Sequence, residues 1–296
     1  MRAIIRGTAL LFLLAGLAPA QTPDTDIFLA AIKRVGDSLV IGPATNITHR
    51  PGYDNQPSFL PNSRGILYTV VGADAQADIW RYDIAERRNS RVTATSESEY
   101  SAVVMPGGLR MSVIRVEADS TQRLWSFALD GSNPQLLLTV LKPVGYHAWL
   151  GPAKLVTFVL GTPATLHVID SDGSHDEIRA RDIGRALQRI PGKDAFSYTQ
   201  RDSNKALWIM SQPVTGESET MLVQAPADNE YHAWTPDALL LSATRSMLVR
   251  WNRALDVTSG WLPVADMSKY GVRNVSRLAV SPDGKWLAFV AEPVTH

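Results

Sequence analysis

The chain of 296 residues contains no cysteine. A disulfide is therefore impossible, as are zinc or redox sites built on cysteine pairs, so the fold must be held by its core alone. The chain also lacks a surplus of one charge, because 29 basic residues face 29 acidic ones. Nucleic-acid binding needs a basic surplus to neutralise phosphates. We therefore predict no nucleic-acid partner.

Sequence motifs of the common enzyme classes are missing as well. There is no Gly-x-Ser-x-Gly elbow, no P-loop, no dinucleotide-binding glycine pattern and no pair of histidines at helical metal-binding spacing. A calcium-loop pattern is also absent. We predict a protein that is not an enzyme and that carries no cofactor and no metal.

Only the N-terminus carries a long apolar run. Residues 9–15 are apolar, two arginines precede them, and Ala18-Pro19-Ala20 follows. A membrane span needs roughly 20 apolar residues, so this short run predicts a secretory signal peptide at residues 1–20 rather than a span. An uncleaved anchor is the alternative, and the polar residues that follow at once speak against it. We expect a mature chain that starts at Gln21 and is periplasmic or secreted.

The rest of the chain, residues 21–296, is one domain with an internal repeat. Tyr-His-Ala-Trp stands at 146–149 and again at 231–234, and Glu99–Val103 is a related copy. The six copies are anchored on the residue before a turn: Phe59, Val103, Trp149, Arg189, Trp234 and Val280. Successive anchors are 44, 46, 40, 45 and 46 residues apart. This period is typical of propeller blades with four strands each.

The two ends of the chain are predicted to share one blade. The last copy has room for only two strands, near residues 276–280 and 285–291. Segments at 26–29 and 46–48 resemble the third and fourth strands of the next copy. Pairing of the two ends would close the ring and remove free sheet edges. The predicted fold is all-β, a six-bladed β-propeller closed by its N- and C-terminal strands.

Two segments resemble a known family. Residues 46–59 look like a blade junction of TolB-like, or WD40-like (PD40), propellers, and residues 280–285 match their Ser-Pro-Asp-Gly turn. The resemblance implies a bacterial periplasmic propeller that binds partners; the namesake of the family acts in the Tol–Pal envelope system. A blade-like strand already begins near Asp26, which leaves no room for the separate N-terminal α/β domain of that namesake. We therefore expect only the propeller to carry over.

The loops that enter the innermost strands contain the candidate binding residues. These residues are Tyr53, Asp54, Asn55, Tyr100, Tyr146 and Tyr231. Such loops surround a propeller's channel, and tyrosine combines apolar area with a polar group, which suits a binding surface. Blade packing is the alternative for the tyrosines, and turn formation is the alternative for the Asp-Asn pair.

His147 and His232 hold equivalent places in two copies of the repeat. One interpretation puts them near the channel mouth, where they contact a ligand or metal. The other makes each a structural histidine that is hydrogen-bonded to the neighbouring blade. Strand alternation places His232 on the face of Trp234, which favours packing.

Taken together, these residues favour a monomeric binding or scaffold module with a protein or peptide partner in the cell envelope. Two alternatives remain. A lactonase-like, metal-dependent hydrolase would need several carboxylate, amide or histidine ligands on the innermost strands, and we find no such set. A carbohydrate-binding propeller would rest on the tyrosines and tryptophans alone.

Overall fold

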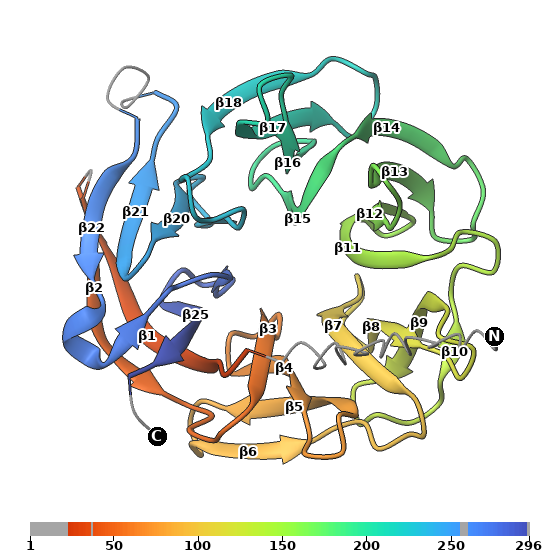
Figure 1. The fold of residues 1–296 in the computed structure, drawn as a ribbon, viewed down its shortest axis with the longest axis horizontal. Helices are drawn as coiled ribbons and strands as arrows, with labels where there is room; N and C mark the ends of the chain where they lie inside the picture. Colours follow the sequence, from red (N-terminus) through yellow and green to blue (C-terminus); the bar gives the residue numbers. More distant parts are fainter. Residues whose placement is uncertain (1–22, 37, 255–259, 295–296) are drawn as a thin grey trace, which may run out of the picture.

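A computed structural model describes residues 23–36, 38–254 and 260–294. The predicted signal peptide at residues 1–20 lies outside these ranges. Six antiparallel sheets stand around a central channel like the blades of a propeller (Figure 1). The described residues hold one helical element, the short 3-10 helix η1 (Ser268–Tyr270). The predicted fold class is therefore confirmed.

Blades one to five each contain four strands that follow one another from the channel outward. In chain order these strands are β3 (Tyr53–Phe59), β4 (Gly65–Val71), β5 (Ala77–Asp83), β6 (Arg88–Arg91), β7 (Ser98–Val104), β8 (Arg110–Val116), β9 (Gln122–Ala128), β10 (Gln135–Leu136), β11 (Val144–Gly151), β12 (Lys154–Val159), β13 (Thr165–Asp170), β14 (Glu177–Arg181), β15 (Ile183–Arg189), β16 (Ala195–Arg201), β17 (Leu207–Pro213), β18 (Thr220–Gln224), β19 (Ala233–Trp234), β20 (Leu240–Thr244), β21 (Met247–Trp251) and β22 (Leu262–Asp266).

The sixth blade joins the two ends of the chain. Its strands are β1 (Asp26–Val35), β2 (Ser38–Asn46), β23 (Val272–Arg273), β24 (Leu278–Val280) and β25 (Trp286–Pro293). Strand β1 pairs antiparallel with β25, so that Asp26 lies opposite Ala291. The predicted closure is confirmed. The outer strand differs from the prediction, because β1 turns back immediately and β2 ends at Asn46, where the sequence placed its start.

All six sequence anchors lie on innermost strands, namely β3, β7, β11, β15, β19 and β24. The second strands explain why the chain reads as continuous apolar runs. In β4, every residue but the last is buried, since both faces of the sheet pack against neighbouring blades. One apolar cluster, for example, brings Ile27 and Val290 of blade six against Ile66 of blade one. The core is thus divided among the interfaces between blades, and each buried aliphatic side chain contributes about 1.5–3 kcal/mol.

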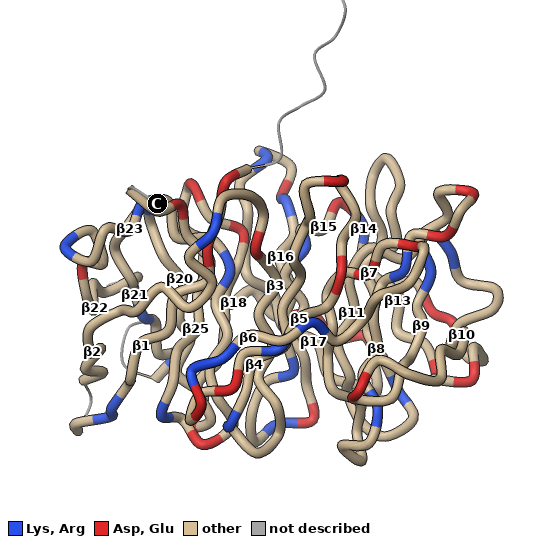
Figure 2. The backbone as a smooth tube through the Cα atoms, turned by 90° about the horizontal axis from the view of Figure 1, so that it is seen from below, with Lys and Arg blue, Asp and Glu red and all other residues tan. Residues whose placement is uncertain are grey.

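Charged residues of both signs alternate over the outer surface (Figure 2). This interspersed distribution agrees with the balanced composition. Among the described residues, no helix is long and apolar enough to cross a membrane.

Candidate functional site

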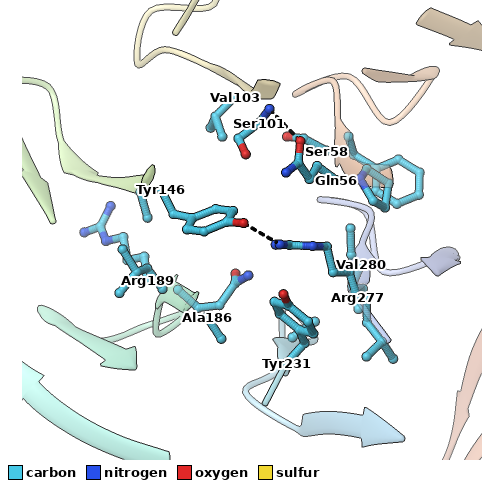
Figure 3. Close-up of a pocket in the computed structure, with 18 of the residues that line it drawn as sticks. Gln56, Ser58, Ser101, Val103, Tyr146, Ala186, Arg189, Tyr231, Arg277 and Val280 are labelled. Atoms are coloured by element: carbon cyan, nitrogen blue, oxygen red, sulfur yellow. Dashed lines mark hydrogen bonds between the residues drawn. The ribbon is translucent and has the colours of Figure 1, made fainter. Parts of the chain in front are cut away.

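The central channel contains a cavity of about 430 Å³ to which the innermost strands of all six blades contribute (Figure 3). A second cavity of about 500 Å³ opens beside it and is lined mainly by blades one to three. Gln56, Tyr146 and Arg185 line both cavities, so the two cavities adjoin. We call this joint space the channel mouth.

The four predicted tyrosines meet at the channel mouth. Tyr53, Tyr100 and Tyr146 line the second cavity, and Tyr231 joins Tyr146 in the first. All four are partly buried and come from four different blades. Burial raises the pKa of Tyr53 to about 12, and the three other tyrosines add to this rise. The structure thus brings four of the candidate residues to the same end of the channel.

Arg277, which directly precedes β24, lies between two of these tyrosines. Its guanidinium carbon is 4.1 Å from the centre of the Tyr231 ring and 4.8 Å from that of Tyr146. One guanidinium nitrogen donates a hydrogen bond of 3.1 Å to the Tyr146 hydroxyl, as Figure 3 shows. Burial works against the charge of Arg277, but the surrounding tyrosines hold its pKa above the ordinary arginine value. The side chain therefore stays cationic inside the channel mouth.

Arg185, on the inner strand of blade four, has an acidic partner. A carboxylate oxygen of Glu230 lies 3.6 Å from its guanidinium, and the other accepts the Arg185 backbone N–H at 3.1 Å. A hydrogen bond with Tyr231 raises the pKa of Arg185. This approach requires Gly184, because a Cβ there would stand 2.8 Å from the Glu230 carboxylate and 2.3 Å from the Thr199 hydroxyl.

The backbone ahead of Arg277 is fixed by Asn229. Its buried side-chain amide donates to the carbonyls of Val275 and Ser276, at 3.2 and 3.1 Å. Its amide oxygen accepts the backbone N–H of Tyr231. One asparagine thus sets the positions of both Tyr231 and Arg277, which belong to different blades.

His147 lies within the wall between blades two and three. Its Nε2 is 2.7 Å from the Ser112 hydroxyl, which also accepts the indole N–H of Trp149 at 2.9 Å. The imidazole is 6% exposed, and burial lowers its pKa to about 3.

The same cluster recurs between blades four and five. His232 lies 2.8 Å from the Ser197 hydroxyl, which accepts the indole N–H of Trp234 at 2.8 Å. Burial again lowers the histidine pKa to about 3. Both histidines border the channel cavity, yet their polar atoms are directed into the neighbouring blade.

Neither histidine–serine pair has the arrangement of a catalytic nucleophile. A nucleophilic serine needs an accessible hydroxyl and a base that a third group orients. Here Ser112 and Ser197 are fully buried, and each hydroxyl is already bonded to an indole. The histidine Nδ1 atoms have no hydrogen-bond partner among the described residues. These clusters are joints between blades.

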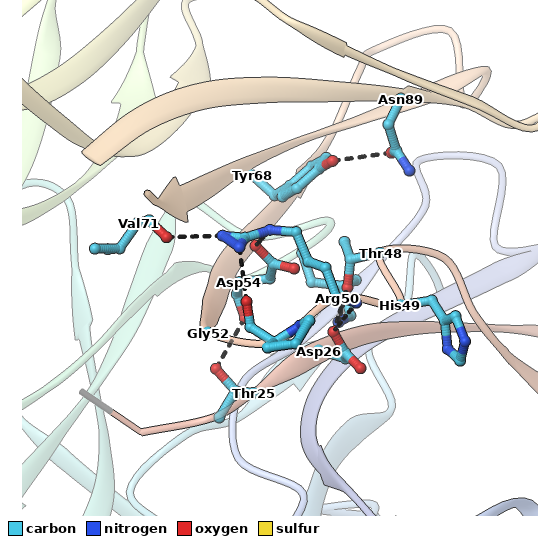
Figure 4. A network of polar contacts seen from close by, with 12 residues as sticks. Thr25, Asp26, Thr48, His49, Arg50, Gly52, Asp54, Tyr68, Val71 and Asn89 are labelled. Atoms are coloured by element: carbon cyan, nitrogen blue, oxygen red, sulfur yellow. Dashed lines mark hydrogen bonds and ion pairs between the residues drawn. The ribbon is translucent and has the colours of Figure 1, made fainter. Parts of the chain in front are cut away.

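Asp54 and Asn55 line neither cavity. The Asp54 carboxylate is fully buried and forms an ion pair of 3.1 Å with Arg50, whose guanidinium also donates to the Val71 carbonyl (Figure 4). The Thr25 hydroxyl donates a hydrogen bond to the backbone carbonyl of Asp54. This hydrogen bond ties the N-terminal segment to blade one. Burial raises the Asp54 pKa to about 7, against the influence of Arg50.

Asp26 completes this network at the start of β1. It accepts hydrogen bonds from the Thr48 hydroxyl at 2.9 Å and the Asn46 amide at 2.6 Å (Figure 4). The network fastens the segment after β2 to the closing blade. It lies at the junction of blades six and one.

Gln56 lines the channel mouth, whereas the predicted site residues Asp54 and Asn55 do not. Its φ of 60° is left-handed and accompanies a β-bulge in β3. The amide oxygen accepts the Thr69 hydroxyl at 2.7 Å and the Ser101 backbone N–H at 2.9 Å. A bulge of this kind re-aims one side chain.

Sequence reasoning did not identify Gln56, Arg185 or Arg277. For Arg277 a signal was present. It stands three residues before the anchor Val280, as Tyr146 stands three before Trp149. Arg277 therefore occupies the repeated tyrosine position in blade six.

The described residues contain no group of three or more histidine, aspartate or glutamate side chains placed to hold a metal ion.

No protein-family model matches the chain, and no curated protein sequence is significantly similar to it. Solved structures are similar in fold. A protein from Agrobacterium tumefaciens, provisionally assigned as TolB, superposes with a TM-score of 0.69 at 12% identity, covering 91% of this chain and 99% of its own. The TolB-like propeller fold is therefore established.

Enzymes share this fold too. A gluconolactonase from Xanthomonas campestris has a TM-score of 0.62 at 9% identity, with 94% of this chain and 99% of that chain covered. An oligogalacturonate lyase in complex with manganese has a TM-score of 0.56 at 14% identity, with coverages of 84% and 80%. At these identities the similarity concerns the fold alone.

Proposed function

We propose that the protein is an exported, non-catalytic binding propeller that engages a protein or peptide partner of the cell envelope at its channel mouth. The convergence of Tyr53, Tyr100, Tyr146 and Tyr231 is the observation that carries this proposal. Partly buried tyrosines on a rigid scaffold offer large contact area at low entropic cost. The predicted signal peptide and the TolB-like fold support an envelope location.

Partner capture tests the proposal. The mature protein, immobilised, is exposed to an envelope extract, and bound proteins are identified beside those held by a variant with Tyr100, Tyr146 and Tyr231 changed to alanine. We expect a partner that binds the wild type and is lost from the variant, since a central aromatic residue typically contributes about 2 kcal/mol or more. Alanine at exposed Val40 on the outer edge serves as control. If the wild type and the triple tyrosine variant capture the same proteins in equal amounts, the proposal is refuted.

A second candidate is a channel-site hydrolase or lyase, which the two enzymes of the same fold support. The purified protein, with and without added Mn²⁺ or Ca²⁺, is assayed on an aldonolactone and on oligogalacturonate. Metal-dependent turnover that fails in a folded Arg277→Gln variant would favour the enzyme and reject the binding module.

A further inference from the structure

The charge of the channel differs from that of the whole molecule. Basic and acidic residues are equal in number along the chain, but the charged residues among the described lining of both cavities are arginines only: Arg185, Arg189 and Arg277. Glu230 partly neutralises Arg185 from just outside the lining. The channel thus holds an excess of positive charge, which favours an anionic ligand.

Arg277 is the arginine that most needs a counter-ion. No carboxylate of the described residues forms an ion pair with it, and its one side-chain hydrogen bond goes to Tyr146. A guanidinium has five N–H donors, so several remain for a ligand. The two tyrosine rings offset part of the lost hydration, but a desolvated charge remains costly until an anion pairs with it.

We infer that the channel mouth is a binding site for a carboxylate, presented by an extended peptide and held by Arg277 between Tyr146 and Tyr231. This inference rests on the proposed function and specifies the chemistry of its ligand. The guanidinium fork matches the planar, two-oxygen geometry of a carboxylate. The carboxylate is either the C-terminus of the peptide or an Asp or Glu side chain.

The innermost strands favour a peptide as the carrier. Strands β3, β7, β11 and β15 each form the channel edge of their sheet. The backbone groups on the channel side of these strands therefore have no partner strand. Such an edge can pair with an extended peptide through backbone hydrogen bonds. Phe59, Trp149 and Trp234 contribute apolar surface to the first of the two cavities.

Three pools of synthetic hexapeptides built from Ala, Ser, Val and Tyr test the inference. The first pool has a free C-terminal carboxylate, the second has an amidated C-terminus and one Asp or Glu, and the third is amidated without any acid. Each is passed over the immobilised mature protein, and retention is measured. We expect the first or second pool to be retained more strongly than the third, and the stronger of the two identifies the source of the carboxylate.

Variants then assign the contact to Arg277. Retention of the acidic pool should fall about 10- to 100-fold in Arg277→Gln, the range for loss of a charge-assisted hydrogen bond. Arg277→Lys should keep part of it, because the charge remains while the fork is lost. Arg88→Gln, on the outer strand of blade one, is the control for loss of one positive charge and should bind as the wild type does. Arg277→Gln loses the Tyr146 hydrogen bond and two ring contacts but breaks no ion pair, so its melting temperature should fall by only about 2–4 °C.

Several results would overturn the inference. Equal retention of the three pools, no retention of any, or unchanged retention by Arg277→Gln would each reject carboxylate recognition. Tighter binding of trigalacturonate or inorganic phosphate than of any peptide pool would reject a peptide as the ligand. If the envelope partner is lost with the tyrosines but kept by Arg277→Gln, the proposed function stands and this inference fails.

Discussion

Tyr231 and His232 are adjacent in the sequence, and both recur in blade three as Tyr146 and His147, yet they serve different parts of the molecule. The tyrosines lie at the channel mouth around Arg277. The histidines turn into the preceding blade and bond to a buried serine. In blade three, alternation along β11 sends Tyr146 and His147 in opposite directions, and the segment just before β19 separates Tyr231 and His232 in the same way. One repeated sequence segment can therefore supply both a contact between blades and part of the channel lining.

Shortening a side chain in one of the histidine–serine–tryptophan clusters should lower the stability of the fold more than shortening a tyrosine at the channel mouth. Trp234→Ala removes an indole that packs beside Leu240 and bonds to Ser197, and it should lower the free energy of unfolding by about 3–5 kcal/mol. Urea denaturation of the mature protein measures this loss. A Tyr231→Ala variant that loses as much stability would erase the distinction between the two regions.

The joint should also fail in acid. His147 and His232 have folded-state pKa values of about 3, far below the unfolded value near 6.5, so the unfolded chain takes up their protons first. Stability from each is complete above pH 6.5 and is lost as the pH falls toward 3, with about 1.4 kcal/mol per histidine gone at pH 5.5.

Denaturation curves of the wild type and of a His147→Gln, His232→Gln double variant at pH 7.5 and 5.5 measure this term. The variant is expected to be less stable at pH 7.5 but to change less between the two pH values. Parallel curves for the two proteins would show that the histidines do not carry the acid sensitivity.

Asp54 should act in the opposite direction. Its folded pKa of about 7 lies above the usual aspartate value, so its contribution is present at low pH and declines as the pH rises from about 4 to 7. Asp54→Asn should remove this decline, which is worth about 4 kcal/mol for a shift of about three pKa units, and thereby expose the histidine effect more clearly. A steeper loss on the alkaline side of this window in the variant would contradict the assignment.

The smallest effect is expected at the mouth itself. Tyr231→Phe keeps the ring beside Arg277 and removes only the hydroxyl that bonds to Arg185, so the free energy of unfolding should fall by about 0.5–1.5 kcal/mol. Thermal melts beside the wild type check this value. A loss above about 2 kcal/mol would mean that Tyr231 is part of the blade packing after all.

The repeat predicted the fold because strand spacing, turn residues and closure are all local or periodic signals. Every anchor from Phe59 to Val280 lies on an innermost strand. The sequence also placed Tyr100, Tyr146 and Tyr231 at equivalent positions, three residues before their anchors, and equivalent positions in a ring point to the same opening. The sequence did not indicate Arg277, because the copies of the repeat were recognised by shared residues and Arg277 replaces the tyrosine that three other copies have at this position.

Other features depend on contacts that no local pattern encodes. Asp54 and Asn55 have the chemistry of a turn or a ligand contact, and only the packed structure shows their burial beside Arg50. The left-handed backbone at Gln56 arises from a bulge against β4, and the sequence around it has no glycine to mark it.

The pairing of β1 with β25 also has a consequence in time. Asp26 is among the first residues of the domain to be synthesised, and its partner Ala291 is among the last, 265 positions later. Blades one to five can form as they emerge, but β1 must wait without its neighbour until β25 has been synthesised. Contacts this distant along the chain slow folding and prolong exposure of an unpaired strand edge. The ring is therefore most vulnerable to aggregation just before it is finished.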